Sequence, residues 1–160
     1  MRRIGRLLIL LILVGAFAAP ASAQSSLQQA TGSGFITDLE IVSEEFAGPN
    51  RIEVRQITGQ VFGDLQGTWT QNVRGVVHPD GRVTFNGTWE FTGEAGDCGI
   101  GTVSGRLTGH GDTGPLPDFP ATTAQARITN QPSNTVPVVG QGTLDQTGPL
   151  ITYDLQYRCR

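Results

Sequence analysis

The sequence contains no lysine, so all eleven of its basic residues are arginines, and fourteen acids outnumber them. We interpret the missing lysine as the codon composition of a GC-rich prokaryote rather than as a chemical requirement. The shortage of positive charge argues against binding to nucleic acid, whose phosphates require a basic surface. It argues equally against binding to an anionic membrane surface. We therefore expect neither partner.

Motifs of the common enzyme classes are also missing. The sequence has no Ser/His/Asp set, no phosphate-binding loop and no cofactor fingerprint. Of its two histidines, His78 lies in the turn "HPDG", where we expect it to be solvated, and His110 lies in "GHGD", close to Asp112. One histidine and one aspartate are too few ligands for a metal site. We expect no metal and no cofactor, and the catalytic residues, if the protein is an enzyme, stay unknown.

The chain begins with a positively charged end. Three arginines within the first six residues precede an apolar run over 7–18, and the small residues "ASA" follow at 21–23. This is the pattern of a secretory signal peptide of the general secretion route, cleaved after Ala23. A membrane anchor is the alternative, but the run is short and ends at Pro20, and no nearby cysteine can carry a lipid. We expect a secreted or periplasmic protein without stable membrane insertion after cleavage.

Cleavage of residues 1–23 leaves 137 residues with a net charge of −6, enough for one domain with its own core. We predict a flexible segment over 24–33 and one domain over 34–160. Both cysteines, Cys98 and Cys159, lie in the exported part, where thiols become oxidised. We predict a disulfide between the "GDCG" turn and the last strand. A catalytic thiol and an intermolecular bridge are the alternatives.

The hydrophobic pattern has a period of two throughout, which predicts strands and no helices. In the strand predicted at 52–62 the apolar side switches between Val54 and Ile57, which predicts a bulge or a twist. Seven or eight antiparallel strands with short connections predict a single all-β meander barrel of about eight strands, with a two-sheet sandwich as the alternative. The predicted strands are 34–45, 52–62, 65–77, 83–92, 101–109, 122–129, 138–144 and 151–159.

One face of these strands alternates glycine with large apolar side chains, a packing that suits the inside of a small closed barrel. We predict that this face lines a cavity. Its candidate ligand-binding residues are Trp69, Phe85, Trp89, Phe91, Leu107, Tyr153 and Tyr157. The two tyrosines either donate hydrogen bonds to a ligand or are core residues whose hydroxyls are already satisfied.

The expected inner face offers no carboxylate. Glu90 lies on the opposite, polar face, where we expect a surface pair with Arg74 or Arg106. If the two faces are reversed, Glu90 becomes the first catalytic candidate. The loop "GHGDTGPLPDFPATTA" holds three prolines and Phe119, which is a candidate lid over the barrel mouth. A plain surface excursion is the alternative for this loop.

Three stretches, "ITGQVFGDLQGTWTQNV", "DGRVTFNGTWEFTGEAGDCGIGTVSGRLTG" and "VPVVGQGTLDQTGPLITYDLQY", follow one another along the chain. Their layout resembles the allene-oxide-cyclase-like barrel families, in particular small uncharacterised prokaryotic members. The resemblance implies an eight-stranded antiparallel barrel with a central cavity, in which the plant cyclases use a polar group to steer ring closure. No catalytic residue carries over onto this chain. The two "GTW" triplets are also similar to lipocalin and avidin signatures, which lie on the first strand of those proteins.

We therefore predict an exported barrel that binds a small hydrophobic molecule in an aromatic-lined cavity. Two other functions stay open: a cofactor-free cyclase or isomerase, as the resemblance implies, and a non-enzymatic structural or interaction module on the cell surface. A cavity above about 300 Å³ favours the first two over the third. A desolvated ionisable group inside the cavity favours the cyclase. Neither the ligand nor the oligomeric state can be read from these residues.

Overall fold

The computed structural model describes residues 26–113, 123–130, 135–136 and 138–160. The predicted signal peptide and the candidate lid residue Phe119 lie outside the described residues. Among the described residues there is no helix of the length and hydrophobicity needed to cross a membrane.

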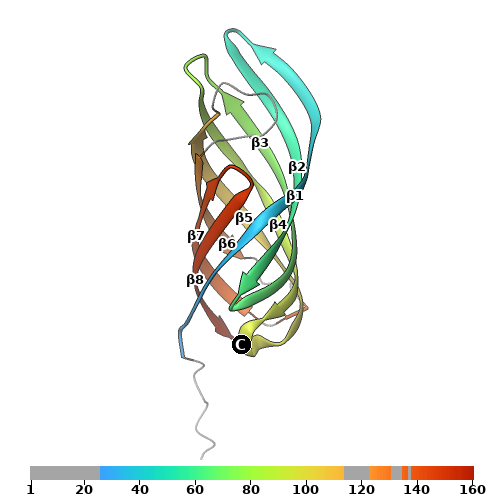
Figure 1. The fold of residues 1–160 in the computed structure, drawn as a ribbon, viewed down its shortest axis with the longest axis vertical. Coiled ribbons are helices and arrows are strands. Elements are labelled where there is room, and N and C mark those ends of the chain that lie inside the picture. Colours follow the sequence, from blue (N-terminus) through green and yellow to red (C-terminus); the bar gives the residue numbers. More distant parts are fainter. Residues whose placement is uncertain (1–25, 114–122, 131–134, 137) are drawn as a thin grey trace, which may run out of the picture.

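Eight antiparallel strands form one closed barrel in chain order, with β8 paired to β1 (Figure 1). The predicted meander barrel is therefore confirmed, and the sandwich alternative is wrong. Strand 65–77 of the prediction matches β3, because its alternating pattern buries one side in the barrel and exposes the other. The strands are β1 (Gln28–Ala47), β2 (Asn50–Gly63), β3 (Leu65–Val77), β4 (Arg82–Ala95), β5 (Ile100–Asp112), β6 (Thr123–Asn130), β7 (Val138–Thr147) and β8 (Leu150–Cys159).

β1 is longer than the sequence pattern predicts. It begins at Gln28, so most of the segment predicted to be flexible is a strand that pairs with β8 over residues 28–35. From Gly32 onward β1 also pairs with β2, and the β1–β2 hairpin rises past the β7–β8 hairpin (Figure 1). The register shifts between Ile36 and Asp38 and between Ile41 and Ser43, both in β1. Of the bulge and the twist predicted in 52–62, the bulge is wrong, because β2 pairs with β3 without a shift and both shifts in its pairing with β1 lie in β1.

Large side chains inside the barrel lie over bare glycine backbone on the neighbouring strand. The ring of Phe85 on β4 occupies the space that a side chain at Gly109 on β5 needs. Trp69 on β3 covers Gly59 on β2 in the same way, with indole carbons 2.6 Å from where a Cβ would lie. This small-against-large packing is the reason that glycine recurs on the inner face.

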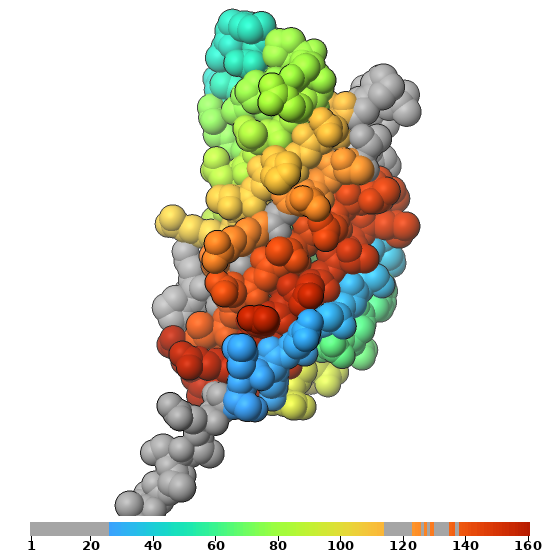
Figure 2. All heavy atoms as spheres, turned by 90° about the vertical axis from the view of Figure 1, so that its left-hand side faces the viewer, coloured from blue at the N-terminus to red at the C-terminus, as the bar shows by residue number. Residues whose placement is uncertain are grey.

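The end of the barrel at which the chain terminates is tied together by a disulfide. Cys98 in the short 3-10 turn η1 (Gly96–Cys98) bonds to Cys159 on β8, with the two Cα atoms 5.2 Å apart. The predicted pairing is confirmed. Figure 2 shows the face on which β8, in red, lies beside the first residues of β1, in blue. The disulfide is compatible with an extracytoplasmic location.

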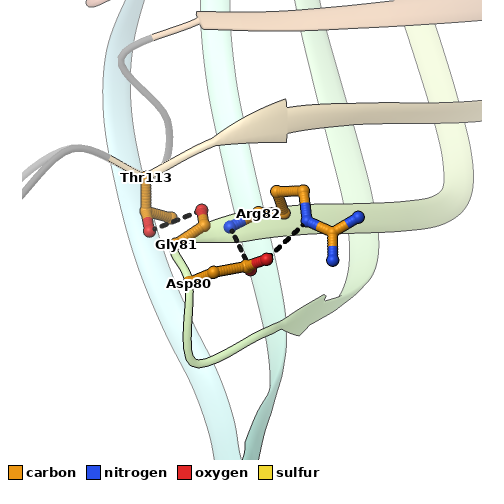
Figure 3. A network of polar contacts seen from close by, with 4 residues as sticks. All are labelled: Asp80, Gly81, Arg82 and Thr113. Carbon is orange, nitrogen blue, oxygen red and sulfur yellow. Dashed lines mark hydrogen bonds and ion pairs between the residues drawn. The ribbon is translucent and has the colours of Figure 1, made fainter.

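The "HPDG" turn joins β3 to β4 and is held by its own polar groups (Figure 3). The Gly81 backbone N–H donates to the His78 carbonyl at 2.9 Å, as a β-turn requires. Asp80 accepts from the backbone N–H and from Nε of Arg82, at 3.2 and 2.7 Å. Thr113, just after β5, donates its N–H and hydroxyl to the Gly81 carbonyl. This turn therefore has a structural role.

Candidate functional site

The barrel interior holds an apolar cavity of about 100 Å³, which we call the apolar chamber. It lies toward the disulfide end, where β3 contributes Leu65 and Trp69 and β8 contributes Tyr153 and Tyr157. Its wall is almost entirely hydrocarbon and aromatic. The lining residues are Val61, Leu65, Trp69, Gln71, Trp89, Phe91, Ala95, Val103, Val138, Gly140, Gln141, Leu144, Ile151, Tyr153, Leu155 and Tyr157.

A second cavity of about 50 Å³, the polar chamber, lies toward the other end of the barrel. Here β3 contributes Val77 and β2 contributes the charged residues Glu53 and Arg55. The remaining lining residues are Ile57, Gln71, Val73, Gly75, Val83, Phe85, Ala124, Leu144 and Gln146. Gln71 and Leu144 line both chambers, so the two adjoin along the barrel axis.

Glu53 is the charged residue at the centre of the polar chamber, and its side chain is only 1% exposed. Its Oε1 pairs with Nε of Arg51 at 2.7 Å, and its Oε2 pairs with Nη2 of Arg55. The Arg55 side chain is 11% exposed, and burial lowers the pKa of its guanidinium in spite of the neighbouring Glu53. Burying charges in this way is costly unless they are paired, which explains the three-residue arrangement.

The expectation that the inner face lacks a carboxylate is wrong. The residues of "RIEVR" alternate charged and apolar, and in the barrel Glu53 and Arg55 line the polar chamber, while Arg51, 40% exposed, pairs with Glu53. The apolar switch between Val54 and Ile57 marks this change of pattern within a regular strand. The spacing of these residues could have predicted the buried carboxylate. Two arginines that each lie two residues from a glutamate share its face of the strand, where they can neutralise its charge.

The predicted cavity residues fall into three groups. Five line the apolar chamber, namely Trp69, Trp89, Phe91, Tyr153 and Tyr157. Phe85 lines the polar chamber, because β4 runs past both. Leu107 is 1% exposed and packs in the core, where it lines neither chamber.

Glu90, His110 and Asp112 lie on the exposed outer side of β4 and β5. Arg74, one of the two predicted partners of Glu90, lies 3.8 Å from Glu45 on β1 instead. Within the described ranges, no three His, Cys, Asp or Glu side chains gather closely enough to hold a metal ion. The chemistry that the fold places in the interior is therefore that of Glu53 and Arg55.

The hydroxyl of Tyr153 is already used by the fold. It accepts a hydrogen bond from the Leu65 backbone N–H at 2.9 Å and donates to the Phe62 carbonyl at 3.1 Å. Its ring lines the apolar chamber while its hydroxyl fixes the β2–β3 turn. Of the two roles considered for this tyrosine, the satisfied core residue is the one that the geometry shows.

Burial raises the pKa of both tyrosines, Tyr153 and Tyr157, the only two in the chain. The folded barrel thus favours the neutral phenol. This contribution to stability is complete below the pKa of an unfolded tyrosine, about 10, and is lost as the pH rises through the higher folded value. We expect the tyrosinate absorbance at 295 nm to appear only above pH 10 and to rise together with unfolding followed by circular dichroism. A normal titration near pH 10 in a still-folded barrel contradicts this.

Comparison with known proteins gives no family. No family model matches the chain, and no curated protein matches it. Among solved structures, the chain is similar to the crystal structure of the conserved protein of unknown function RPA1785 from Rhodopseudomonas palustris. The identity is 17% and the TM-score 0.48, over 82% of this chain and 97% of that chain. A likeness at this level carries no functional information, so the function rests on the cavity.

Proposed function

We propose that this protein is exported by its signal peptide and binds one small apolar molecule in the apolar chamber. The observation that carries the proposal is a space inside the barrel whose walls are apolar and aromatic. Such a space gains free energy when an apolar molecule fills it, because the walls otherwise lack contacts on one side.

The size of the chamber limits the ligand. At about 100 Å³ it is smaller than the roughly 300 Å³ at which pockets for drug-sized molecules begin, so its volume alone does not favour binding over a filled structural barrel. An engineered apolar cavity of about 150 Å³ in another protein stays dry and binds benzene. We therefore expect a ligand no larger than one ring or a short branched chain, and no long-chain lipid.

The two tryptophans of the chain, Trp69 and Trp89, both line the apolar chamber, so their fluorescence reports on its contents. We expect cyclohexane to shift the tryptophan emission in a saturable way and the two-ring decalin to have no effect. Val138→Phe fills the chamber and should weaken cyclohexane binding at least tenfold. Val139→Phe, on the other side of the same strand β7, is the matched control and should bind normally.

Two results contradict the binding proposal. If cyclohexane gives no saturable change in the folded, disulfide-intact protein, the interior acts as a filled core, and the structural or interaction module is the better reading. If Val138→Phe binds as well as Val139→Phe, the binding site lies elsewhere.

One observation favours the second candidate function, a cofactor-free isomerase or cyclase of the allene-oxide-cyclase-like type. An ionisable pair, Glu53 and Arg55, lies inside the barrel next to the apolar chamber. Desolvated charges are the groups that general acid–base or electrostatic catalysis requires. The two candidates separate when a molecule extracted from the protein of the native host is returned to it. Recovery of the same compound by chromatography supports binding, and conversion to an isomer supports catalysis.

A further inference from the structure

The two chambers adjoin at Gln71 and Leu144, which line both. β3 runs along both, with Trp69 in the apolar chamber, Val77 in the polar chamber and Gln71 in both. A molecule whose body fills the apolar chamber thus has its end directed past Gln71 and Leu144 toward Arg55. The polar groups of the polar chamber therefore determine which chemical group the end of the ligand carries.

Among the described charged groups of the polar chamber, one donor is left without any polar contact. Within the described residues, neither carboxylate oxygen of Glu53 makes a hydrogen bond of good geometry, but each is in an ion pair, one with Arg51 and one with Arg55. Nε of Arg55 is buried and has no hydrogen-bond partner in the part of the chain that the structure describes. Arg51 and Arg55 share one buried carboxylate, Glu53, and the other carboxylate that acts on Arg55, Glu44, is exposed to solvent.

From these contacts we infer that the ligand is a small amphiphile, a short apolar body that ends in a carboxylate held by Arg55. The inference rests on the proposed binding function and names its ligand class. A guanidinium binds a carboxylate through parallel N–H···O bonds, and the unused Nε–H of Arg55 supplies one of them. The Arg51 side chain is 40% exposed, so solvent can satisfy its donors, whereas the Arg55 side chain is only 11% exposed. An unpaired donor therefore costs more free energy at Arg55 than at Arg51.

The alternative heads fit less well. A cationic head brings a third positive charge next to Arg51 and Arg55, while both oxygens of Glu53 are occupied. A purely apolar molecule fills the apolar chamber but leaves Nε of Arg55 without a partner. Hydrogen-bonding groups of this kind give a site its selectivity, because an unpaired buried donor is costly.

The test compares head groups on one body, in the wild-type protein with its disulfide intact. The probes are 4-methylpentanoate, isopentylammonium and the hydrocarbon 2,5-dimethylhexane, followed by tryptophan fluorescence at neutral pH. We expect 4-methylpentanoate to bind at least ten times more tightly than isopentylammonium. Equal affinities, or a preference for the ammonium, overturn the inference.

The three probes also separate this inference from the binding function on which it rests. If the hydrocarbon binds and the carboxylate does not, the carboxylate head is wrong and the apolar site stands. If none of the three binds, both proposals fail.

A variant then locates the head group. Arg55→Gln should weaken 4-methylpentanoate binding at least tenfold and leave 2,5-dimethylhexane within about threefold of wild type. Arg74→Gln, at a half-exposed arginine outside the barrel, is the matched control and should change neither. Equal loss of both probes in Arg55→Gln means that the substitution disturbs the fold, and the wild-type head-group comparison then decides alone.

Discussion

Replacing Glu53 with glutamine should lower the free energy of unfolding by about 3 to 5 kcal/mol, the range for breaking a buried ion pair. The substitution keeps the shape of the side chain and removes its charge. Arg55, with a side chain only 11% exposed, is then a buried cation without its partner. Urea denaturation of the disulfide-intact protein, followed by circular dichroism, measures the change.

Glu45→Gln is the matched control for this experiment. Glu45 also pairs with an arginine, Arg74, but its side chain is 70% exposed and the atoms are 3.8 Å apart. Solvent and salt screen such a pair, so its loss should cost less than about 1 kcal/mol. Replacing Glu53 and Arg55 together by methionine should recover part of the loss, because the one charge left without its partner, Arg51, is 40% exposed to solvent. Equal costs at Glu53 and Glu45 contradict the buried pair.

Removing the disulfide should have an effect of similar size. The bond between Cys98 and Cys159 closes a loop of 61 positions, and the chain-entropy model gives about 4 kcal/mol for a loop of this length. In a domain of this size, that corresponds to a fall in Tm on the order of 10 °C. We expect this fall when wild-type protein is treated with dithiothreitol.

The double variant with alanine at both cysteines, Cys98→Ala and Cys159→Ala, controls for effects of the reductant. It should melt where the reduced wild type melts, and dithiothreitol should not shift it further. A wild type whose Tm is unchanged, although a thiol assay shows both cysteines to be free, means that the β4–β5 turn is held by its other contacts.

The fold could be predicted from the sequence because most strands alternate without interruption. β3, β4 and β8 carry large apolar or small residues at every second position. With this period of two, all of these residues lie on one side of the strand, and that side must be the inner face. The glycines supported closure into a barrel, because Phe85 and Trp69 need bare backbone opposite them. The disulfide could be predicted because the chain has two cysteines and the predicted signal peptide places both where thiols become oxidised.

The polar chamber could not be predicted because its strand breaks the rule that apolar residues point inward. Ile52 and Val54 are apolar and outward, whereas Glu53 is charged and inward, and only the neighbouring arginines make that arrangement tolerable. The length of β1 was missed for a different reason. Gln28 and Gln29 give no apolar signal, and their strand conformation comes from pairing with β8, more than a hundred residues away.

That same pairing governs how the molecule reaches its folded state. Gln28 lies opposite Tyr157, so the first residues of β1 find their partner only when β8 is present. Contacts between distant parts of a chain make folding slow, because a long loop must close before they form. Until β8 is in place, β1 and β7 each have an edge without a partner strand, and Cys98 has no thiol to join. Such unpaired edges are the places most exposed to pairing with other chains.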